Sequence, residues 1–366
     1  MAKRILNMLK GISNRVKNNN RPQKNDASSR TTSQKIMQDF TNNYHLAEYF
    51  KRNIDSNINI NELMQLYGKR LENESYFYNL PLLTKLSKEQ TTELAKDFFK
   101  TLDPKLYKKA EDILDCKNNE YIFVFEKEGN KYENSNNNDN VEILDYIRKV
   151  RKPDPEQFDI FKPKENGEHR RYTCISIPEK GDLRDLYCIV HEITHTFDKD
   201  DKDTETREIF SEVAPHCTER MLDEFLLNLS DEYIKTYGIN REMLKQDIKD
   251  RKISTFLQRY YSINSLNNKN ERTLKDLKYT LGLLYSSSFM NLSSKTRINE
   301  LTKFIDNIKE NNMNACSKSF GINLNNKLNV QFKIDQLVQN ILRICNQLPE
   351  QGNLKKTRRK NKEKIR

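Results

Sequence analysis

Apolar residues recur at the three-and-four spacing of an amphipathic helix along most of the chain. This spacing predicts helices at residues 34–53, 60–73, 87–101, 104–115, 141–150, 206–228, 241–263, 271–291, 296–311 and 333–347. Two short runs, Tyr121–Phe125 and Arg171–Ile177, are rich in β-branched and aromatic residues and predict strands. The asparagine-rich segment 126–140 between them is expected to be a flexible excursion. The pattern therefore predicts a mainly α fold of the α+β class with one small sheet.

A further helix is expected directly after the second strand. Asp182 follows the turn residues Lys180 and Gly181 and is a good N-cap, and Asp185 stands at the N3 position of a capping box. Apolar residues then recur at helical spacing and give this helix a face to bury, namely Leu186, Val190, Ile193 and Phe197.

The same helix carries the motif H-E-x-x-H, formed by His191, Glu192 and His195. Histidines at positions i and i+4 lie on one face of a helix, so both imidazoles can reach one metal ion. Zn²⁺ binds such nitrogen ligands, and Glu192 would lie beside the water that the metal activates. The alternative is that both histidines are ordinary helix residues satisfied by hydrogen bonds. We favour the zinc site, because the strand, the turn and the cap all agree with it.

A third ligand is expected on the helix predicted at 206–228. One stripe of that helix is polar and contains Glu208, Glu212, His216, Glu219 and Asp223. A stripe of this kind is most often a solvated charged face. A carboxylate on a helix soon after H-E-x-x-H can also complete a zinc site.

The run Phe210–Glu219 resembles the second metal-site helix of the thimet oligopeptidase and oligoendopeptidase F family of gluzincin metallopeptidases. In that family a glutamate, followed by a pair of small residues and by another glutamate seven positions on, supplies the third zinc ligand. The resemblance therefore implies that Glu212 binds zinc together with His191 and His195.

The strings Cys174–Ile177, Gly181–Leu183 and Tyr187–Val190 are similar to the edge strand and active-site helix of the same family. The likeness covers about residues 170–228. It implies a zincin-like helical metallopeptidase domain whose edge strand lies beside the H-E-x-x-H helix. It also implies an enzyme that hydrolyses peptide bonds in oligopeptides or extended segments, with Glu192 as general base.

A weaker likeness covers Lys278–Gly282, which is similar to the Tyr-x-x-Gly segment of that family. There, tyrosines help to hold the reacting carbonyl, so the resemblance implies this role for Tyr279 or Tyr285. The commoner explanation for either residue is a tyrosine of the hydrophobic core. The backbone of 172–177 is expected to pair with an extended peptide by strand addition.

Other acidic and histidine residues near the motif leave two questions open. Glu219 and Asp223 form an E-x-x-x-D pair, which another zinc-peptidase family uses for a ligand and its support, although we prefer Glu212 as the ligand. The residues expected to orient the ligating imidazoles are Asp185, His216, Glu219 and Asp223.

Basic charge is concentrated at the two ends of the 366-residue chain, whose net charge is +11. Residues 1–30 and residues 351–366 each carry eight Lys or Arg against one acidic residue. We expect a basic, disordered or weakly helical segment at 1–33, one mostly helical domain at 34–350 and a disordered basic tail at 351–366. Such ends could bind nucleic acid or an anionic surface non-specifically.

Two further classes of function stay open on the sequence: a zinc-binding interaction protein with weak or no catalysis, and a basic-tailed protein that binds nucleic acid or anionic surfaces. The six cysteines contain no C-x-x-C spacing, and no apolar run approaches a membrane span. We therefore expect reduced thiols and a cytoplasmic protein without a signal peptide, with export or targeting through the basic ends left open.

Overall fold

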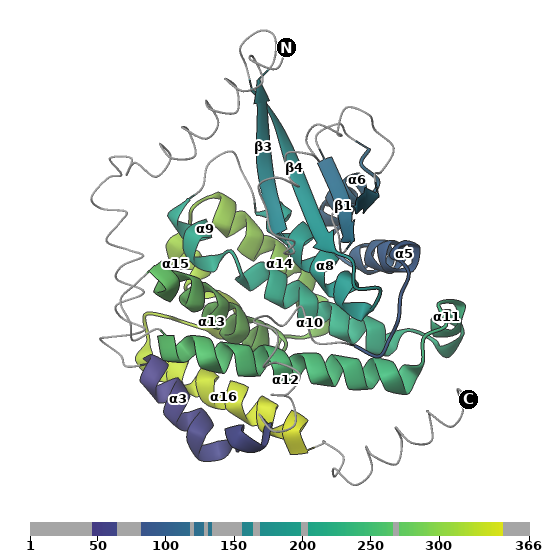
Figure 1. Ribbon diagram of the computed structural model, residues 1–366. Coiled ribbons are helices and arrows are strands. Elements are labelled where there is room, and N and C mark those ends of the chain that lie inside the picture. The colour runs from purple at the N-terminus through teal and green to yellow at the C-terminus, as the bar shows by residue number, and fades with distance from the viewer. Residues whose placement is uncertain are drawn as a thin grey trace, which may run out of the picture.

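The computed structural model describes residues 46–63, 82–117, 121–127, 131–133, 156–163, 169–198, 204–265 and 271–346. These residues form a mainly α-helical fold with one small sheet, which confirms the predicted fold class (Figure 1). The expected basic segment 1–33, the tail 351–366, the helix at 141–150 and most of the helix at 60–73 lie outside the described residues. The division of the chain into these parts stays a prediction.

The sheet has four strands in the order β2-β1-β4-β3. They are β1 (Tyr121–Lys127), β2 (Lys131–Glu133), β3 (Glu156–Pro163) and β4 (His169–Pro178). Strand β4 pairs parallel with β1 and antiparallel with β3, so Thr173–Ser176 have neighbours on both sides.

Two expectations about this sheet are wrong. The strand at 171–177 is an interior strand, and β3 is the edge strand on that side, so the backbone of Thr173–Ser176 offers no free edge to a peptide. The segment 126–140 is not all irregular, because Lys131–Glu133 pair with β1 as a short strand. The spacing of apolar residues shows that a strand forms, but it does not show which partners that strand will have.

Helix α8 (Leu183–Phe197) follows β4 and contains the H-E-x-x-H motif (Figure 1). The predicted N-cap is confirmed, because the Asp182 carboxylate accepts a hydrogen bond from the N–H of Arg184, but Asp185 does not form the predicted capping box with Asp182. The Asp185 carboxylate accepts hydrogen bonds from the N–H groups of Lys180 and Gly181, and Gly181 takes the positive φ of 67° that this turn requires. Every residue of α8 except His195 is buried. The motif therefore lies on the central helix of the core.

Helices α5 (Lys88–Phe99) and α6 (Pro104–Leu114) pack on α8 from the side of β1. The predicted capping box of Ser87 and Gln90 is present at the start of α5, and Pro104 occupies the first turn of α6. On the other side of α8 lie α10 (Val213–Asn228), α12 (Arg241–Ser265) and α13 (Glu271–Phe289), with α13 packed along α10. The remaining elements complete the core: α3 (Leu46–Asn57), α9 (Glu205–Phe210), α11 (Asp231–Thr236), α14 (Ser294–Lys309), α15 (Met313–Cys316), the 3₁₀ turn η4 (Ser319–Gly321) and α16 (Lys327–Asn346).

The single helix expected at 206–228 is divided in two. Helix α9 ends at Phe210, Ser211 and Glu212 form a turn, and α10 begins at Val213. Pro215 explains the break, because it has no N–H to donate to the carbonyl of Ser211 and its ring would clash with that carbonyl in a continuous helix. In the first turn of α10 a proline is tolerated.

Within the described part of the chain, no helix is both long and apolar enough to cross a membrane. The six cysteines, all within the described residues, form no disulfide with one another, and four of them are buried.

Candidate metal centre

Helix α8 and the turn between α9 and α10 bring His191, His195 and Glu212 together. One ligand atom from each lies within 4.8 Å of the other two. The Nε2 atoms of the two histidines are 3.1 Å apart. Oε2 of Glu212 lies 3.4 Å from Nε2 of His191, and Oε1 of the same carboxylate lies 3.8 Å from Nε2 of His195. Two ligands of a tetrahedral zinc ion lie about 3.3 Å apart, so the three side chains are close enough together to bind one zinc ion.

The break before α10 determines where Glu212 lies. Glu212 has φ −85° and ψ −8° and occupies the N-cap position of α10, but its side chain caps no backbone N–H. Its carboxylate is therefore available to the histidines of α8. The atom Oε2 of Glu212 is buried, and Nε2 of His191 lies 3.4 Å from it without the alignment of a good hydrogen bond. A buried carboxylate oxygen with so weak a donor is energetically costly, and a bound cation would satisfy it.

The electrostatics of the three residues suit a cation. Burial lowers the pKa of His195 to about 3, so this imidazole is neutral and can bind a metal. Burial acts to raise the pKa of Glu212, but the neighbouring His195 and His191 outweigh it and hold this pKa well below the usual range. Burial also acts to lower the pKa of His191, but hydrogen bonds with Glu212 and Glu219 raise it well above the usual value. The proton held on His191 is one that a metal ion would displace.

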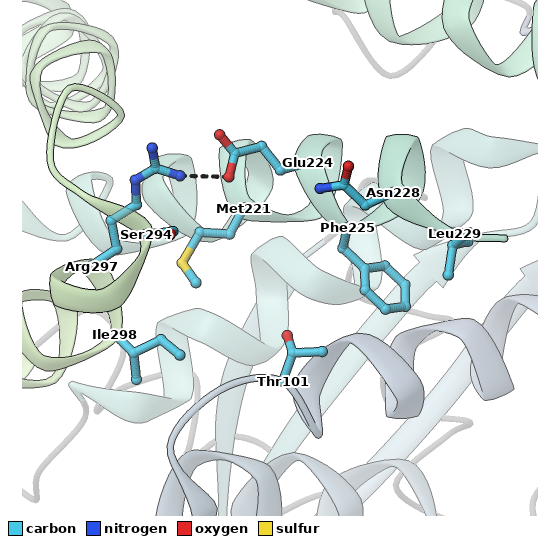
Figure 2. A pocket seen from close by; sticks show the side chains of 9 residues that line it. All are labelled: Thr101, Met221, Glu224, Phe225, Asn228, Leu229, Ser294, Arg297 and Ile298. Atoms are coloured by element: carbon cyan, nitrogen blue, oxygen red, sulfur yellow. Dashed lines mark hydrogen bonds and ion pairs between the residues drawn. The ribbon is translucent and has the colours of Figure 1, made fainter.

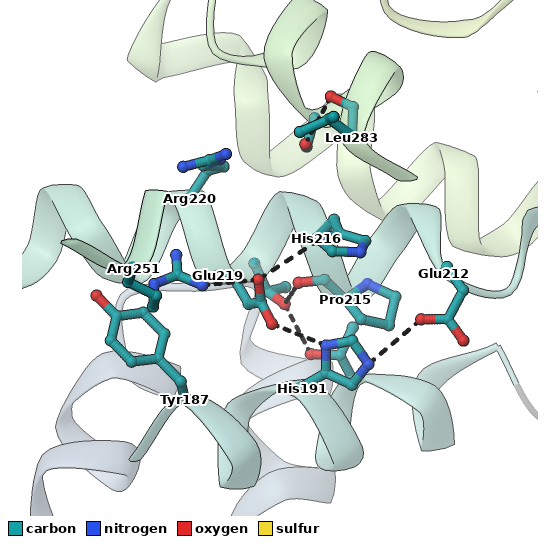
Figure 3. Close-up of polar contacts among 12 residues, drawn as sticks. Tyr187, His191, Glu212, Pro215, His216, Glu219, Arg220, Arg251 and Leu283 are labelled. Carbon is teal, nitrogen blue, oxygen red and sulfur yellow. Dashed lines mark hydrogen bonds and ion pairs between the residues drawn. The ribbon is translucent and has the colours of Figure 1, made fainter. Parts of the chain in front are cut away.

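Glu219 orients the first histidine. Nδ1 of His191 lies 2.9 Å from Oε1 of Glu219, and Figure 3 shows Glu219 and Glu212 on different sides of the His191 ring. Because a carboxylate only accepts hydrogen bonds, Nδ1 carries a hydrogen, and Nε2 is the nitrogen that would bind a metal ion once its own hydrogen is displaced. Glu219 thus contacts the outer nitrogen of a ligand, and Glu212 faces the inner one. This geometry favours Glu212 over Glu219 as the third ligand.

Arg251 of α12 supports Glu219 and was not identified from the sequence. Its side chain is 1% exposed, and it donates to Glu219 (2.9 Å) and to Asp223 (3.0 Å). Its guanidinium carbon lies 3.7 Å from the ring centroid of Tyr187, and the Tyr187 hydroxyl donates to Asp223 at 2.6 Å. The only sequence signal was the pair of acids Glu219 and Asp223, which need a cation if they are buried.

The other predicted residues lie at different distances from the cluster. Asp223 contacts Arg251 rather than a histidine, and Asp185 holds the turn before α8. Glu192 is buried at 5% exposure, directly after the first histidine. Tyr279 is half-buried, and the negative charge of Glu212 raises its pKa well above the usual value.

The structure does not bring Tyr285 to the cluster. Its ring packs against Phe210, Phe304 and Phe320, and its buried hydroxyl has no hydrogen-bond partner. Of the two tyrosines, only Tyr279 has a ring close to the site, with its centroid 6.2 Å from that of His216.

Gly282 of α13 lets this helix approach the metal site. A Cβ atom at this position would lie 2.3 Å from Cδ2 of His216 and 2.9 Å from the carbonyl oxygen of Glu212. No side chain fits there. The glycine of the Tyr-x-x-Gly segment is therefore explained by the close contact between α13 and the start of α10.

A surface pocket of about 340 Å³ lies on another face of α10 (Figure 2). It is lined by Thr101, Met221, Glu224, Phe225, Asn228, Leu229, Ser294, Arg297 and Ile298. At 100° per residue, Met221 and Phe225 point away from the side of α10 that carries His216 and Glu219. The pocket is therefore separate from the metal centre, and none of the residues predicted for the site lines it.

No protein-family description and no curated protein matches this sequence. Among solved structures, the chain is similar to that of a candidate peptidase from Chlamydophila abortus, with 12% sequence identity and a TM-score of 0.40. The match covers 81% of this chain and 55% of that one, so the chain spans about half the length of the protein it matches.

Proposed function

We propose that this protein is a zinc-dependent metallopeptidase. The observation that supports this proposal most strongly is the convergence of His191, His195 and Glu212, whose ligand atoms lie close enough together to bind one zinc ion. Three protein ligands leave a fourth position for water or substrate, which is the arrangement of a catalytic rather than a structural zinc site.

The residues of the chain would divide the chemistry among them. Zinc, when bound at such a site, supplies Lewis acidity that makes water a nucleophile near neutral pH and polarises a peptide carbonyl. Glu192 would accept the proton of the attacking water and pass it to the leaving amine. The hydroxyl of Tyr279 would donate a hydrogen bond to the oxygen on which negative charge develops.

The surroundings of Glu192 support this division. Glu192 is buried and directly follows the ligand His191 in the sequence. Tyr279 comes from α13, whose close contact at Gly282 brings this helix against the residues that follow Glu212.

Metal content and hydrolysis together test the proposal. We expect wild-type protein without a histidine tag to hold about one zinc per chain by elemental mass spectrometry, and His195→Ala to lose it. Wild type should cleave members of a peptide library, and Glu192→Gln should keep its zinc and lose cleavage. Zinc bound without any cleavage would point instead to a zinc-binding interaction protein. Absence of zinc after zinc is supplied would end the metallopeptidase proposal.

A further inference from the structure

A row of side chains from four helices leads away from the metal cluster. The ring of His191 lies 5.8 Å from that of His216, and the ring of His216 lies 6.2 Å from that of Tyr279. The guanidinium carbon of Arg259 then lies 3.9 Å from the ring centroid of Tyr279. The side chains of His216 and Tyr279 therefore lie between His191 and Arg259.

Arg259 has no acidic partner among the residues that the structure describes. This distinguishes it from Arg251, Arg184 and Arg297, each of which pairs with a carboxylate. The atom Nε of Arg259 is buried and makes no hydrogen bond, although the residue as a whole is only half-buried. An arginine that is held on an aromatic ring and has an unused Nε donor is suited to bind a carboxylate through two hydrogen bonds.

His216 presents a second unused group in the same row. The residue is 5% exposed, and its Nε2 atom is buried without a hydrogen-bond partner. Its Nδ1 atom lies 3.5 Å from the Glu219 carboxylate, which can only accept, so Nδ1 carries the hydrogen and Nε2 is an acceptor. The row therefore offers a cationic donor for a carboxylate and an acceptor for an N–H group, both next to the ring of Tyr279.

We propose that Arg259 and His216 form a subsite for the C-terminal residue of a peptide. That residue carries a carboxylate and an amide N–H on the same Cα atom, which matches the guanidinium of Arg259 and Nε2 of His216. An acidic side chain offers the carboxylate without the N–H beside it, so the terminal carboxylate fits better. This inference rests on the proposed function, because the metal cluster marks where the bond would be cleaved. The protein would then act near the C-terminal end of its substrates.

Binding measured without turnover tests the subsite. The full-length Glu192→Gln variant, supplied with zinc, would be titrated with a fluorescein-labelled pentapeptide of alanine and leucine, as the free acid and as the C-terminal carboxamide. We expect fluorescence anisotropy to show at least about tenfold tighter binding of the acid. Adding Arg259→Gln should reduce this preference to less than about twofold, and Arg259→Lys should restore part of it, because a lysine keeps the charge but not the fork.

Two controls make the result specific. Arg52→Gln removes the same charge from an exposed position of α3 and should leave the preference unchanged. A third peptide, a carboxamide with one internal glutamate, tests the other source of a carboxylate. Equal binding of acid and carboxamide, or a preference that survives Arg259→Gln, would overturn the inference. So would an internal glutamate that binds as tightly as the free acid and loses its affinity with Arg259→Gln.

The outcomes also separate this inference from the proposed function. Zinc content and cleavage by the wild type are measured independently of the acid-to-carboxamide ratio. A preference for the acid that depends on Arg259 but comes without cleavage would retain the subsite and refute the peptidase. Cleavage with no such preference would retain the peptidase and refute the subsite.

Discussion

At the scale of single residues, two glutamates seven positions apart contact the same histidine from different sides. Glu212 faces Nε2 of His191 at 3.4 Å, whereas Glu219 faces Nδ1 at 2.9 Å. Of the two nitrogens of His191, Nε2 is the one that lies next to the second histidine, 3.1 Å from Nε2 of His195. The two residues have the same chemistry, so their substitution separates a ligand from a residue that orients a ligand.

We predict that Glu212→Gln abolishes stoichiometric zinc binding, because a neutral amide leaves two imidazoles as the only strong ligands. Glu219→Gln should keep the site and weaken zinc binding by about 10–100-fold, because the orientation of His191 is loosened rather than a ligand lost. Competition with a chromophoric chelator measures both affinities. The reverse order of effects would assign the ligand role to Glu219.

Tyr279 and Tyr285 provide a matched pair for the hydrogen bond to the reacting carbonyl. We predict that Tyr279→Phe lowers kcat by about 10²–10³-fold with zinc content unchanged, because one donor to the developing charge is removed. Tyr285→Phe should leave kcat within about twofold of wild type, because its hydroxyl lies in the aromatic core without a partner. Steady-state kinetics with the library peptide that wild type cleaves fastest would measure kcat for both variants. A large loss of kcat with Tyr285→Phe would show that the two roles are exchanged.

At the scale of elements, the sequence predicts features that depend on nearby residues better than features that depend on contacts between distant segments. The starts of α5, α6 and α8 follow from caps that lie within a few residues, and the structure contains these caps. Strand β3 was missed because a run of eight residues around Phe158 and Ile160 gives a weak signal until its partner β4 is known. The placement of β4 as an edge strand was wrong for the same reason.

The candidate site shows the same division. His191, Glu192, His195 and Glu212 could be proposed from one short region, because the chain brings them together over about twenty residues. Arg251 and Arg259 could not, because they reach the site from α12 through contacts between helices distant in sequence. Even Pro215, visible in the sequence, was read as part of a continuous helix rather than as the cause of its break.

Gly282 allows the packing of α13 on α10 to be tested. In an exposed helix, Gly→Ala stabilises by about 0.5–1 kcal/mol. Here the added Cβ would lie 2.3 Å from His216 and 2.9 Å from the carbonyl of Glu212, so we predict a loss of stability instead. Gly282→Ala should cost about 1–3 kcal/mol in urea unfolding and should also weaken zinc binding. A stabilised variant would contradict the close contact.

Arg251 ties α12 to α10 and, through Glu219, to α8. We predict that Arg251→Met destabilises the metal-free protein by about 3–5 kcal/mol, because Glu219 and Asp223 lose their buried cation. Arg52→Met, which removes an exposed ion pair with Glu48, should change stability by less than about 1 kcal/mol. Urea unfolding in the presence of a chelator measures both. Equal losses of stability from the two substitutions would show that the buried ion pairs of Arg251 stabilise the protein no more than an exposed pair does.

At the scale of the whole molecule, the candidate metal centre joins parts of the fold that are already held together by packing and by hydrogen bonds such as the one between His191 and Glu219. His191 and His195 belong to α8, which is buried beside the sheet, and Glu212 belongs to the turn that leads into the helices around α13. A metal ion bound to all three would cross-link these two parts. Without it, the buried Oε2 atom of Glu212 keeps only a poorly aligned contact with Nε2 of His191.

Removal of the metal should therefore lower stability without dissolving the fold. At free zinc about 1,000 times its Kd, binding adds about 4 kcal/mol to the free energy of unfolding, which for a chain of this size corresponds to a Tm shift on the order of 5–10 °C. We predict that a chelator lowers the Tm of wild type by this amount, while far-UV circular dichroism at 20 °C stays unchanged, because the core does not depend on the ion. His195→Ala should show no chelator effect, since its site is already broken. If neither the chelator nor added zinc changed the Tm of wild type, the cluster would bind no metal. The close approach of His191, His195 and Glu212 would then result from helix packing alone.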